Sequence, residues 1–252
     1  MTCEFSRTEL LIGPDAMNRL ASSAVLIFGV GGVGSHCIEA LARSGIGRLI
    51  LADPDQVSIT NINRQSIAFH STVGRYKTHV MKERILDINP KAVVETRETF
   101  ILPDNLDAFF DSLPEPVDYI IDAVDTVSAK LAIAALASAH GIPLIASMGT
   151  GNKLHPELFE ITDIRNTSVC PLCKVMRREL KRLGIPKLTV LYSKEPPIKP
   201  AGHGESSRLP ADSGRQSPPA RRSVPASISF VPPIAGLLIA GHVIRDLIGQ
   251  AL

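Results

Sequence analysis

Short apolar runs alternate with helical stretches over the first two thirds of the chain. The apolar, β-branched runs predict buried strands over residues 24–29, 48–53, 92–100, 117–122 and 143–148. Between them, the pattern predicts helices over residues 35–44, 76–88 and 127–140, the first of which is closed by Gly45. Strands that alternate with helices specify a mostly parallel sheet with helices on both faces. We therefore predict an α/β, doubly wound, Rossmann-like fold.

The apolar segment "ISFVPPIAGLLIAGHVI" (228–244) is predicted to form a buried helix that begins after Pro233. Proline is harmless in a first helical turn, where its missing N–H would have no partner. The apolar residues between Pro233 and Arg245 are too few for the roughly 20 that span a bilayer. We therefore expect no stable membrane insertion. The chain opens with "MTCEFSRTEL", which lacks the apolar core of a secretory signal, so we expect a cytoplasmic protein.

Residues 195–227 differ from the rest of the chain in composition. They are rich in proline, glycine, serine and arginine and contain almost nothing that could be buried. Such a segment cannot offset the entropy cost of ordering and is expected to be mobile. It is either a passive linker or a loop that orders over the site when a large substrate binds. Because an apolar segment follows it, we predict one domain over residues 1–252 that contains this loop.

The composition limits which partners and which cysteine chemistry are plausible. The chain has 252 residues, 44% hydrophobic and 21% charged, with a net charge of +2, so any basic surface has to be local. Its 4 cysteines are too few for a disulfide framework in a chain of this length. Cys170 and Cys173 form one C-x-x-C pair, which we interpret as ordinary thiols, a redox pair or, less well, a zinc site, because no second pair supplies the other ligands.

A glycine-rich turn follows the first predicted strand. Gly29, Gly31 and Gly34 fit the pattern G-x-G-x-x-G, with Gly32 inside it, and Asp53 lies about twenty residues further on. Glycines let the backbone approach phosphates, a helix N-terminus presents free N–H groups, and the acid accepts from ribose hydroxyls. These features are common to NAD and ATP sites, and taken alone they favour a nicotinamide dehydrogenase over an ATP-dependent enzyme.

The charged residues that follow favour ATP. Arg64 and Lys77 supply cations, which nicotinamide redox chemistry does not need. Cleavage between the α and β phosphates does need cations, because negative charge develops on the transferring group and on the departing pyrophosphate. Asp125 follows a predicted strand, where a carboxylate faces the nucleotide crevice and can hold Mg²⁺. Together, Arg64, Lys77 and Asp125 describe an ATP site.

Four motifs carry a family resemblance. In order, "GVGGVGS", "ADPDQVSITNINRQ", "GRYK" and "DAVDT" resemble the superfamily of ThiF, MoeB and the adenylating domains of ubiquitin-activating enzymes. That resemblance covers about residues 5–150 and implies that ATP activates a carboxylate by forming an acyl-adenylate. It implies that Arg64 and Lys77 bind phosphates and that Asp125 binds Mg²⁺ and is essential. It also implies that Asp53 binds the ribose. The nucleotide-binding residues implied are Gly29, Gly31, Gly32, Gly34, Asp53, Asp55, Asn61 and Gln65.

The resemblance also bears on assembly and on the alternative substrate. The segment "FSRTELL" resembles one that carries an arginine into the neighbouring subunit's site, so Arg7 is expected to act across a homodimer. The sulfur-carrier activators of the superfamily adenylate the C-terminal carboxylate of a ubiquitin-like protein for thiamin or molybdopterin synthesis. They usually carry two C-x-x-C pairs, and this chain has one. A sulfur-transfer or other accessory protein partner stays open.

The second half resembles one branch of the superfamily, the tRNA threonylcarbamoyladenosine dehydratases. The resemblance is carried by "SMGTGNKLHPELFEITDIRNTSVCPL", "KVMRRELKRLGI", "VLYSKEPP" and "SISFVPPIAGLLIAGHVIRDL". It implies a ligase-type enzyme that adenylates the threonine carboxylate of N6-threonylcarbamoyladenosine beside the anticodon, releasing pyrophosphate. Ring closure would then release AMP, so that the net change is loss of water. A transient thioester on Cys170 or Cys173 is a further, less favoured route.

A tRNA substrate requires a basic surface, and one segment offers it. The run "KVMRRELKRLGIPK" fits an amphipathic helix with Val175, Met176, Leu180 and Leu183 on its buried face. Lysine and arginine contacts to phosphates supply affinity without sequence information. The alternative is an ordinary solvated helix face. The cations expected to contact tRNA are Lys174, Arg177, Arg178, Lys181 and Arg182.

Overall fold

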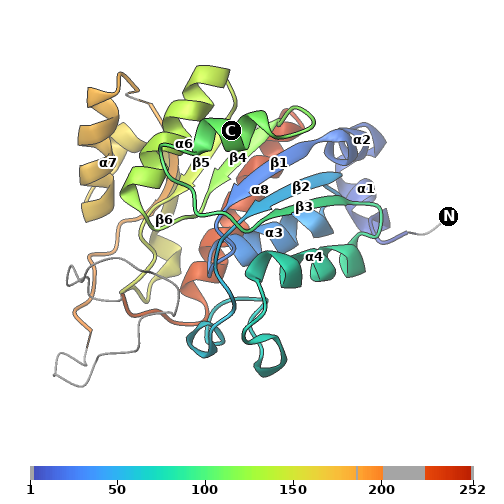
Figure 1. Ribbon diagram of the computed structural model, residues 1–252, viewed down its shortest axis with the longest axis horizontal. Coiled ribbons are helices and arrows are strands. Elements are labelled where there is room, and N and C mark those ends of the chain that lie inside the picture. The colour runs from blue at the N-terminus through green and yellow to red at the C-terminus, as the bar shows by residue number, and fades with distance from the viewer. Residues whose placement is uncertain (1–2, 186, 201–224, 251–252) are drawn as a thin grey trace.

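The computed structural model describes residues 3–185, 187–200 and 225–250. At its centre lies a seven-stranded sheet in the order β3-β2-β1-β4-β5-β7-β6 (Figure 1). All neighbouring strands are parallel except β6 and β7, so the predicted α/β class and mostly parallel sheet are confirmed. The strands are β1 (Ala24–Phe28), β2 (Arg48–Ala52), β3 (Val93–Arg97), β4 (Tyr119–Asp122), β5 (Leu144–Ser147), β6 (Phe159–Asp163) and β7 (Thr189–Ser193).

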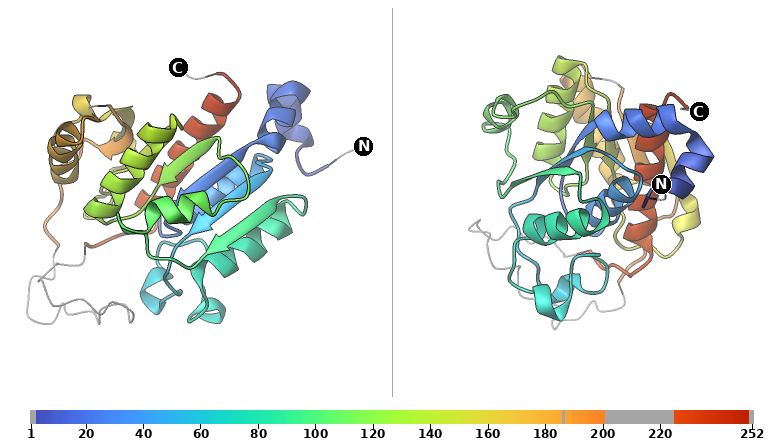
Figure 2. Two further views of the ribbon diagram at one scale, coloured as in Figure 1. Left: turned by 45° about the horizontal axis from the view of Figure 1, so that its top comes forward. Right: turned by 90° about the vertical axis from the view of Figure 1, so that its right-hand side faces the viewer.

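Helices cover both faces of the sheet, as the two views of Figure 2 show. One core cluster joins α3, α4 and α8 to the sheet, and two others join α5, α6 and α7 to its opposite face. The helices are α1 (Ser6–Ile12), α2 (Pro14–Ser22), α3 (Gly34–Arg43), α4 (Lys77–Ile88), α5 (Leu106–Asp111), α6 (Val127–His140), α7 (Pro171–Arg182) and α8 (Val231–Leu247).

Strand β1 shows why the apolar runs are continuous rather than alternating. Val25 and Ile27 belong to one core cluster, whereas Leu26 and Phe28 belong to the cluster on the other face. Successive side chains of a strand point to opposite faces, so a strand covered on both sides needs apolar residues at every position. All four side chains are fully buried.

The structure has two strands that the sequence pattern did not predict, and each of the five predicted strands is shorter than expected. Strand β3 ends at Arg97 rather than at residue 100. Strands β6 and β7 form an antiparallel pair at one edge of the sheet, with Ile161 opposite Leu191. Helix α7 separates these two strands in the chain, so their pairing depends on tertiary contacts and not on a local turn.

Helix α8 begins three residues earlier than predicted. It starts at Val231, so Pro232 and Pro233 both lie in the first turn, where a missing N–H leaves no carbonyl unpaired. Its buried residues Ala235, Ile239, Ala240 and Val243 belong to the same core cluster as helix α3. None of the helices that the structure describes is long and apolar enough to cross a membrane.

The predicted loop over residues 195–227 is partly corrected. Residues 201–224 lie outside the described residues. Glu195 is only 4% exposed, and its carboxylate accepts from the backbone N–H groups of Leu154 and His155. Both flanks meet at Asn152, whose carbonyl accepts from Ile198 N (2.8 Å) and whose N–H donates to Ala226 O (2.8 Å). The described ends of the segment therefore meet at one residue.

We predict that Gly236→Ala destabilises the fold while Gly241→Ala, in the same helix, does not. A Cβ at Gly236 would lie 2.3 Å from Val33 O, a backbone atom, so overpacking should cost about 1–3 kcal/mol of unfolding free energy. At Gly241 the nearest atom is the flexible end of Arg245, at 3.3 Å. The gain in helix propensity there, about 1 kcal/mol, should make Gly241→Ala neutral or stabilising. Urea unfolding measures both, and equal effects would contradict the prediction.

Candidate functional site

The glycine turn between β1 and α3 is packed directly against the turn between β4 and α6. Gly29 has φ +95°, and a Cβ there would lie 2.7 Å from Ala123 O. A Cβ at Gly34 would lie 1.8 Å from Gly29 O, so neither position accepts a side chain. Gly31 has open space, with Gln65 Nε2 the nearest atom at 4.0 Å. The backbone at Gly31 is therefore accessible to a ligand, beside the first turn of α3.

Asp53 fixes the end of β2 to this turn. Its Oδ2 accepts from Val30 N (2.7 Å) and its Oδ1 from Asp55 N (2.9 Å). The residue is 6% exposed, and burial raises the pKa of its carboxyl, an effect that the nearby Lys77 ammonium opposes. Each carboxylate oxygen has a second lone pair, so both can still accept from another donor.

Lys77 lies with Asp53 and Asp55 in one charged cluster. It is the first residue of α4 and is 4% exposed. Its Nζ lies 2.8 Å from Asp55 Oδ2 and 3.9 Å from Asp53 Oδ1. The structure thus brings together three residues that the sequence predicted for the nucleotide site. The ammonium is held in place before any ligand arrives.

The loop over residues 59–66 brings Asn61, Arg64 and Gln65 to the glycine turn. Asn61 is buried, and its Oδ1 accepts from Ser58 N (3.0 Å), so this part of the amide holds the loop. A Cβ at Gly32 would lie 3.3 Å from Arg64 Cγ, which places the arginine stem against the turn. Among the buried side-chain polar atoms of the described residues, Gln65 Oε1 lacks a hydrogen-bond partner. The loop therefore offers polar groups beside the open Gly31.

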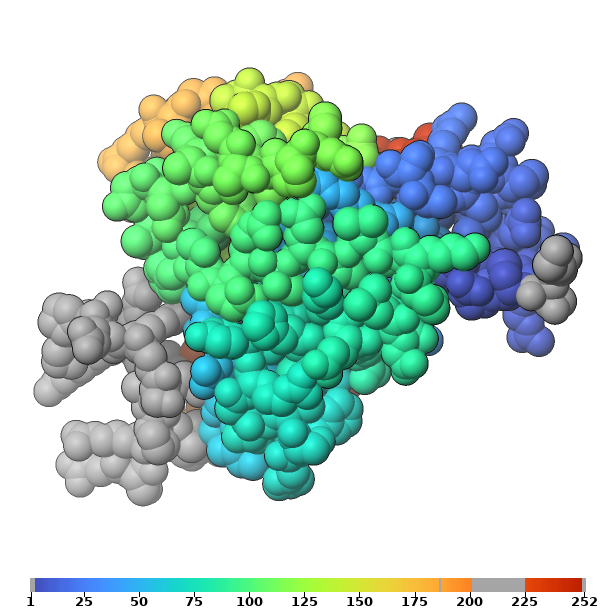
Figure 3. Space-filling model, turned by 45° about the vertical axis from the view of Figure 1, so that its right-hand side comes forward, coloured from blue at the N-terminus to red at the C-terminus, as the bar shows by residue number. Residues whose placement is uncertain are grey.

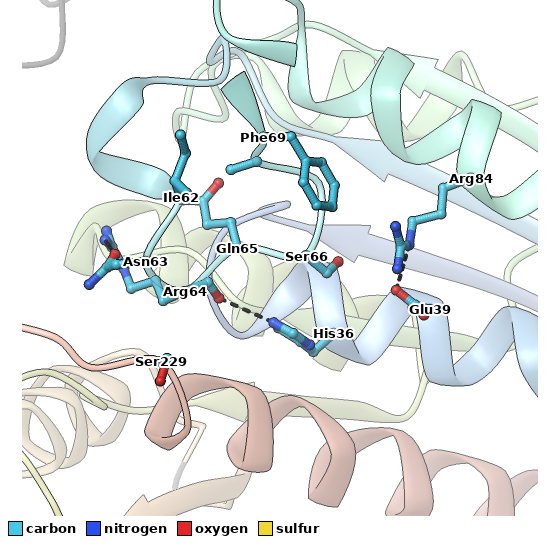
Figure 4. Close-up of a pocket in the computed structure, with 11 residues that line it drawn as sticks. His36, Glu39, Ile62, Asn63, Arg64, Gln65, Ser66, Phe69, Arg84 and Ser229 are labelled. Carbon is cyan, nitrogen blue, oxygen red and sulfur yellow. Dashed lines mark hydrogen bonds and ion pairs between the residues drawn. The ribbon is translucent and has the colours of Figure 1, made fainter. Parts of the chain in front are cut away.

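Arg64 and Gln65 also line a cavity of about 380 Å³ on the other side of this loop (Figure 4). The cavity lies between α3, the loop, Arg84 of α4 and the segment before α8. His36 Nε2 donates to Arg64 O (3.1 Å), and burial lowers the pKa of this histidine. Arg64 Nη1 donates to Asn63 Oδ1 (2.8 Å). The guanidinium is therefore oriented by the loop itself.

Asp125 lies in the turn after β4, and a buried ion pair supports that turn. Lys130 Nζ donates to both oxygens of Asp122 (3.1 Å each) and to Ser147 O (2.7 Å). Asp122 Oδ1 also accepts from Val124 N (3.1 Å), the residue before Asp125. Asp125 itself is exposed. The buried pair of Asp122 and Lys130 therefore holds the turn that carries the expected metal ligand.

Lys130 was missed by sequence reasoning, although a signal was present. It is a single charged residue within the apolar run of α6, "VSAKLAIAALASAH", and is 1% exposed. A lysine on a buried helix face has to find a partner, because an unpaired buried charge is very costly. Burial raises the pKa of Asp122, and the attraction of Lys130 opposes that effect.

Helix α7 has the predicted amphipathic character, but its buried face differs. Cys173, Met176 and Leu180 are buried, whereas Val175 and Leu183 are 37% and 53% exposed, which corrects the expectation for both. The helix begins at Pro171, before the predicted run, so the face that meets the core is set by Cys173. The loop before α7 and the helix together determine which cations remain at the surface.

The five basic residues expected to contact tRNA are not equivalent. Arg177 is half-buried, and its Nη1 donates to Thr167 O (2.9 Å), so it holds the loop before the helix. Arg178 and Arg182 both pair with Glu179. Lys174 and Lys181 are exposed. These two lysines are the residues of the set best placed to meet a phosphate.

Arg7 lies at the opposite end of α3 from the glycine turn of its own chain. Phe5, two residues before it, is 3.8 Å from the position of a Cβ at Gly45, just beyond the C-terminus of α3. A helix of 10 residues is about 15 Å long. Helix α1 is exposed, with Leu10 at 87% and Leu11 at 85%, and projects from the body with α2 (blue in Figure 3).

Comparison with known proteins places this geometry in a family. The ThiF family model matches residues 5–251. The tRNA threonylcarbamoyladenosine dehydratase of Bacillus subtilis (strain 168) is 43% identical over 256 residues, which cover 98% of this chain and 96% of that protein. The protein of the same name from Escherichia coli (strain K12) is 39% identical over 177 residues, 70% of this chain and 65% of that protein. The predicted resemblance is confirmed.

The solved structures agree with the sequence comparison. Two crystal structures of the E. coli tRNA N6-threonylcarbamoyladenosine dehydratase, one with ATP and one with AMP, match with a TM-score of 0.84. Both are 30% identical to this chain, and the match covers 98% of this chain and 94% of the E. coli chain. These matches support the dehydratase branch over the sulfur-carrier alternative.

We predict that Lys130→Met destabilises the protein strongly. The change leaves Asp122 buried without its partner, a loss of roughly 3–5 kcal/mol for a broken buried pair. Lys194→Met is the matched control, because Lys194 pairs with Glu160 (2.5 Å) while its side chain is 54% exposed. An exposed pair contributes about 0–1 kcal/mol. Urea unfolding measures both variants, and an effect of Lys130→Met below 1 kcal/mol would show that Asp122 finds another partner.

Proposed function

Because the chain belongs to the ThiF family, we propose that it is an ATP-dependent tRNA threonylcarbamoyladenosine dehydratase. The observation that carries the proposal is the cluster of Lys77, Asp53 and Asp55 beside an open glycine turn. In this reaction the threonine carboxylate of N6-threonylcarbamoyladenosine, next to the anticodon of a tRNA, is activated and cyclised. A tRNA substrate places the activity in the cytoplasm.

The residues of the site suit a nucleoside triphosphate. The N–H groups at the start of α3 and the open backbone at Gly31 donate to phosphate oxygens, and Asp53 accepts from the ribose hydroxyls. Arg64 packs against Gly32 of the turn, and Lys77 lies beside Asp53. These two cations neutralise the negative charge of the departing pyrophosphate. Asp125 is an exposed carboxylate beside this turn, the hard oxygen donor that Mg²⁺ prefers, and we assign the metal to it. Mg²⁺ neutralises phosphate charge when it is bound.

The proposed reaction has two steps. An oxygen of the threonine carboxylate attacks the α phosphorus of ATP, and the bond to the β phosphate breaks, so pyrophosphate leaves. A nitrogen or oxygen of the same modification then attacks the activated carbonyl and expels AMP, which closes the ring. The attacking group is tethered to the carbonyl, so the second step is intramolecular and needs no nucleophile from the enzyme. Overall, one water is removed from the nucleoside, and ATP becomes AMP and pyrophosphate.

Helix α7 is the surface that we assign to the tRNA backbone. Lys174 and Lys181 are exposed, while Arg177 holds the neighbouring loop. Phosphate contacts from a few lysines give an affinity that falls with salt, and the salt dependence of tRNA binding measures them.

We assign Arg7 to the site of a second copy in a homodimer. Within one chain, Arg7 lies beyond the far end of α3, about 15 Å long, so it does not reach the glycine turn from which that helix starts. The exposed Leu10 and Leu11 on the same helix offer apolar surface for a partner copy.

The first test uses tRNA that carries threonylcarbamoyladenosine, with ATP and Mg²⁺. We expect a nucleoside lighter by one water in mass spectrometry, with AMP and pyrophosphate released. Asp125→Asn should lower the rate by roughly 10²-fold or more, the scale for removing one electrostatic stabiliser. Asp87→Asn, an exposed aspartate near the C-terminus of α4, is the matched control and should leave the rate unchanged.

The same assay can reject the proposal. AMP release that needs a ubiquitin-like protein with a C-terminal glycine pair, and not the modified tRNA, would favour the sulfur-carrier alternative. tRNA without the threonylcarbamoyl group is the substrate control and should yield no AMP.

Mixing inactive subunits tests the homodimer. Arg7→Ala and Asp125→Asn should each be inactive alone, but a mixed dimer contains one site with neither change. Random pairing in a two-fold dimer therefore restores up to about a quarter of the wild-type activity. Lys77→Ala mixed with Asp125→Asn is the control, because both changes lie in the same subunit's share of the site. Mixed dimers without recovered activity would remove Arg7 from the partner's site.

A further inference from the structure

Two thiols lie together at the start of α7, and the proposed reaction uses neither. Cys170 is the N-cap of the helix, and its carbonyl accepts the helical hydrogen bond from Lys174 N (3.2 Å). Cys173 lies in the first turn, because the helix begins at Pro171. Cys170 is 4% exposed and Cys173 is fully buried. A C-x-x-C pair on the first helical turn places its two sulfurs next to each other.

The sulfur of Cys170 is surrounded by donors. The Cys173 thiol and the backbone N–H groups of Cys173, Leu172 and Gly149 lie around it. These donors, the Cys173 thiol above all, lower the pKa of Cys170 to about 5, while contact with Cys170 raises the pKa of Cys173. The arrangement therefore favours the thiolate form of Cys170 and the thiol form of Cys173.

Charged groups from three segments face this pair. The Lys153 ammonium, in the loop after β5, is attracted by the Cys170 thiolate and donates to Glu195 O (2.5 Å). The charge of Glu195, after β7, attracts the Lys153 ammonium. The positive charge of Arg177, on α7, lowers the pKa of Cys173 and so opposes part of its rise. Lys153 is 5% exposed, and burial lowers the pKa of its ammonium. The thiolate thus has a cation close by in a site that excludes most water.

The backbone before the pair is strained. Val169 has φ +60°, a region that a β-branched residue rarely adopts. Its side chain is 53% exposed, so its own packing does not account for this conformation. Strain of this kind persists where the surrounding structure imposes it, often at functional positions. Here it directly precedes the N-cap cysteine.

We propose that Cys170 and Cys173 form a dithiol site that reacts with small hydroperoxides and closes to a reversible disulfide. The Cys170 thiolate attacks one oxygen of hydrogen peroxide, the O–O bond breaks, and the hydroxide released takes up a proton to become water. Cys170 is now a sulfenic acid. Cys173 gives up its proton and attacks the Cys170 sulfur, so an S–S bond forms and a second water leaves. The two thiols lose two electrons, and the peroxide gains them.

Burial selects the class of oxidant. With Cys170 at 4% exposure, a disulfide as large as oxidised glutathione cannot reach its sulfur while α7 stays in place. Hydrogen peroxide is close to water in size. The site is therefore expected to react with hydroperoxides much faster than with disulfides.

The other two cysteines of the chain serve as internal controls. Cys3 is exposed and lies far from the pair in the chain. Cys37 is fully buried in the core, where burial alone raises the pKa of its thiol. Neither has a second cysteine nearby in the sequence. Neither should yield an intramolecular disulfide.

The test treats the full-length protein with hydrogen peroxide and maps each cysteine by peptide mass spectrometry. We expect the peptide that holds residues 170–173 to lose two hydrogens and to regain them with dithiothreitol. Cys173→Ser should instead accumulate a sulfenic acid at residue 170 that dimedone traps, and Cys170→Ser should form neither product. Circular dichroism checks that both variants fold. A peptide whose two thiols stay alkylatable while Cys3 is oxidised would overturn the proposal.

Two further measurements separate this site from an ordinary thiol. The rate at Cys170 should change less than about 2-fold between pH 6.5 and 8.5, because the group is ionised throughout. A free thiol such as glutathione gains roughly 50-fold over that range, from its usual pKa near 8.5. Oxidised glutathione should be at least about tenfold slower than peroxide at equal concentration. A rate that follows the glutathione profile, or equal rates with both oxidants, would overturn the proposal. None of these readouts depends on the dehydratase reaction.

Discussion

Direct backbone contact at the carboxyl ends of β1 and β4 determines the arrangement of the whole site. Gly29 meets Ala123 O and Gly34 meets Gly29 O at distances that leave no room for a Cβ. Because the two turns touch, the groups that each strand carries beyond its end have to converge. The glycine turn, Asp53 and the turn that carries Asp125 therefore share one edge of the parallel sheet, where α/β folds bind ligands.

The charges of the site are paired before any ligand binds. Lys77 lies between Asp53 and Asp55, and Lys130 is held by Asp122 and Ser147 O. The cluster of Lys77, Asp53 and Asp55 lies at the edge of the sheet where phosphates would bind. The pair of Lys130 and Asp122 is fully buried. Groups whose positions are fixed in advance need no reorganisation when charge develops, which is the basis of electrostatic catalysis. The two lysines thus serve different purposes, one toward the ligand and one toward the scaffold.

Helix α7 combines three tasks on its different faces. Met176 and Leu180 join the core, Lys174 and Lys181 face solvent, and the first turn holds the Cys170–Cys173 pair. Arg177 ties the helix to the loop before it through Thr167. A change at the first turn would therefore be transmitted to the neighbouring Lys153, because that ammonium is attracted by the Cys170 thiolate.

The sequence by itself determined the fold class, the places of the first five strands along the chain and the polar residues that gather beside the glycine turn. These follow from local features: continuous apolar runs require burial on both faces, and the glycines, Asp53 and Lys77 lie at fixed places relative to predicted strands and helices. Only the tertiary structure decided which surface residues are available. Arg177 and Val175 are both on α7, yet Arg177 is bound by Thr167 of the loop before the helix. Val175 stays exposed. The pairing of β6 with β7, the partner of Lys130 and the strain at Val169 likewise depend on segments distant in the chain, and no local pattern encodes such contacts.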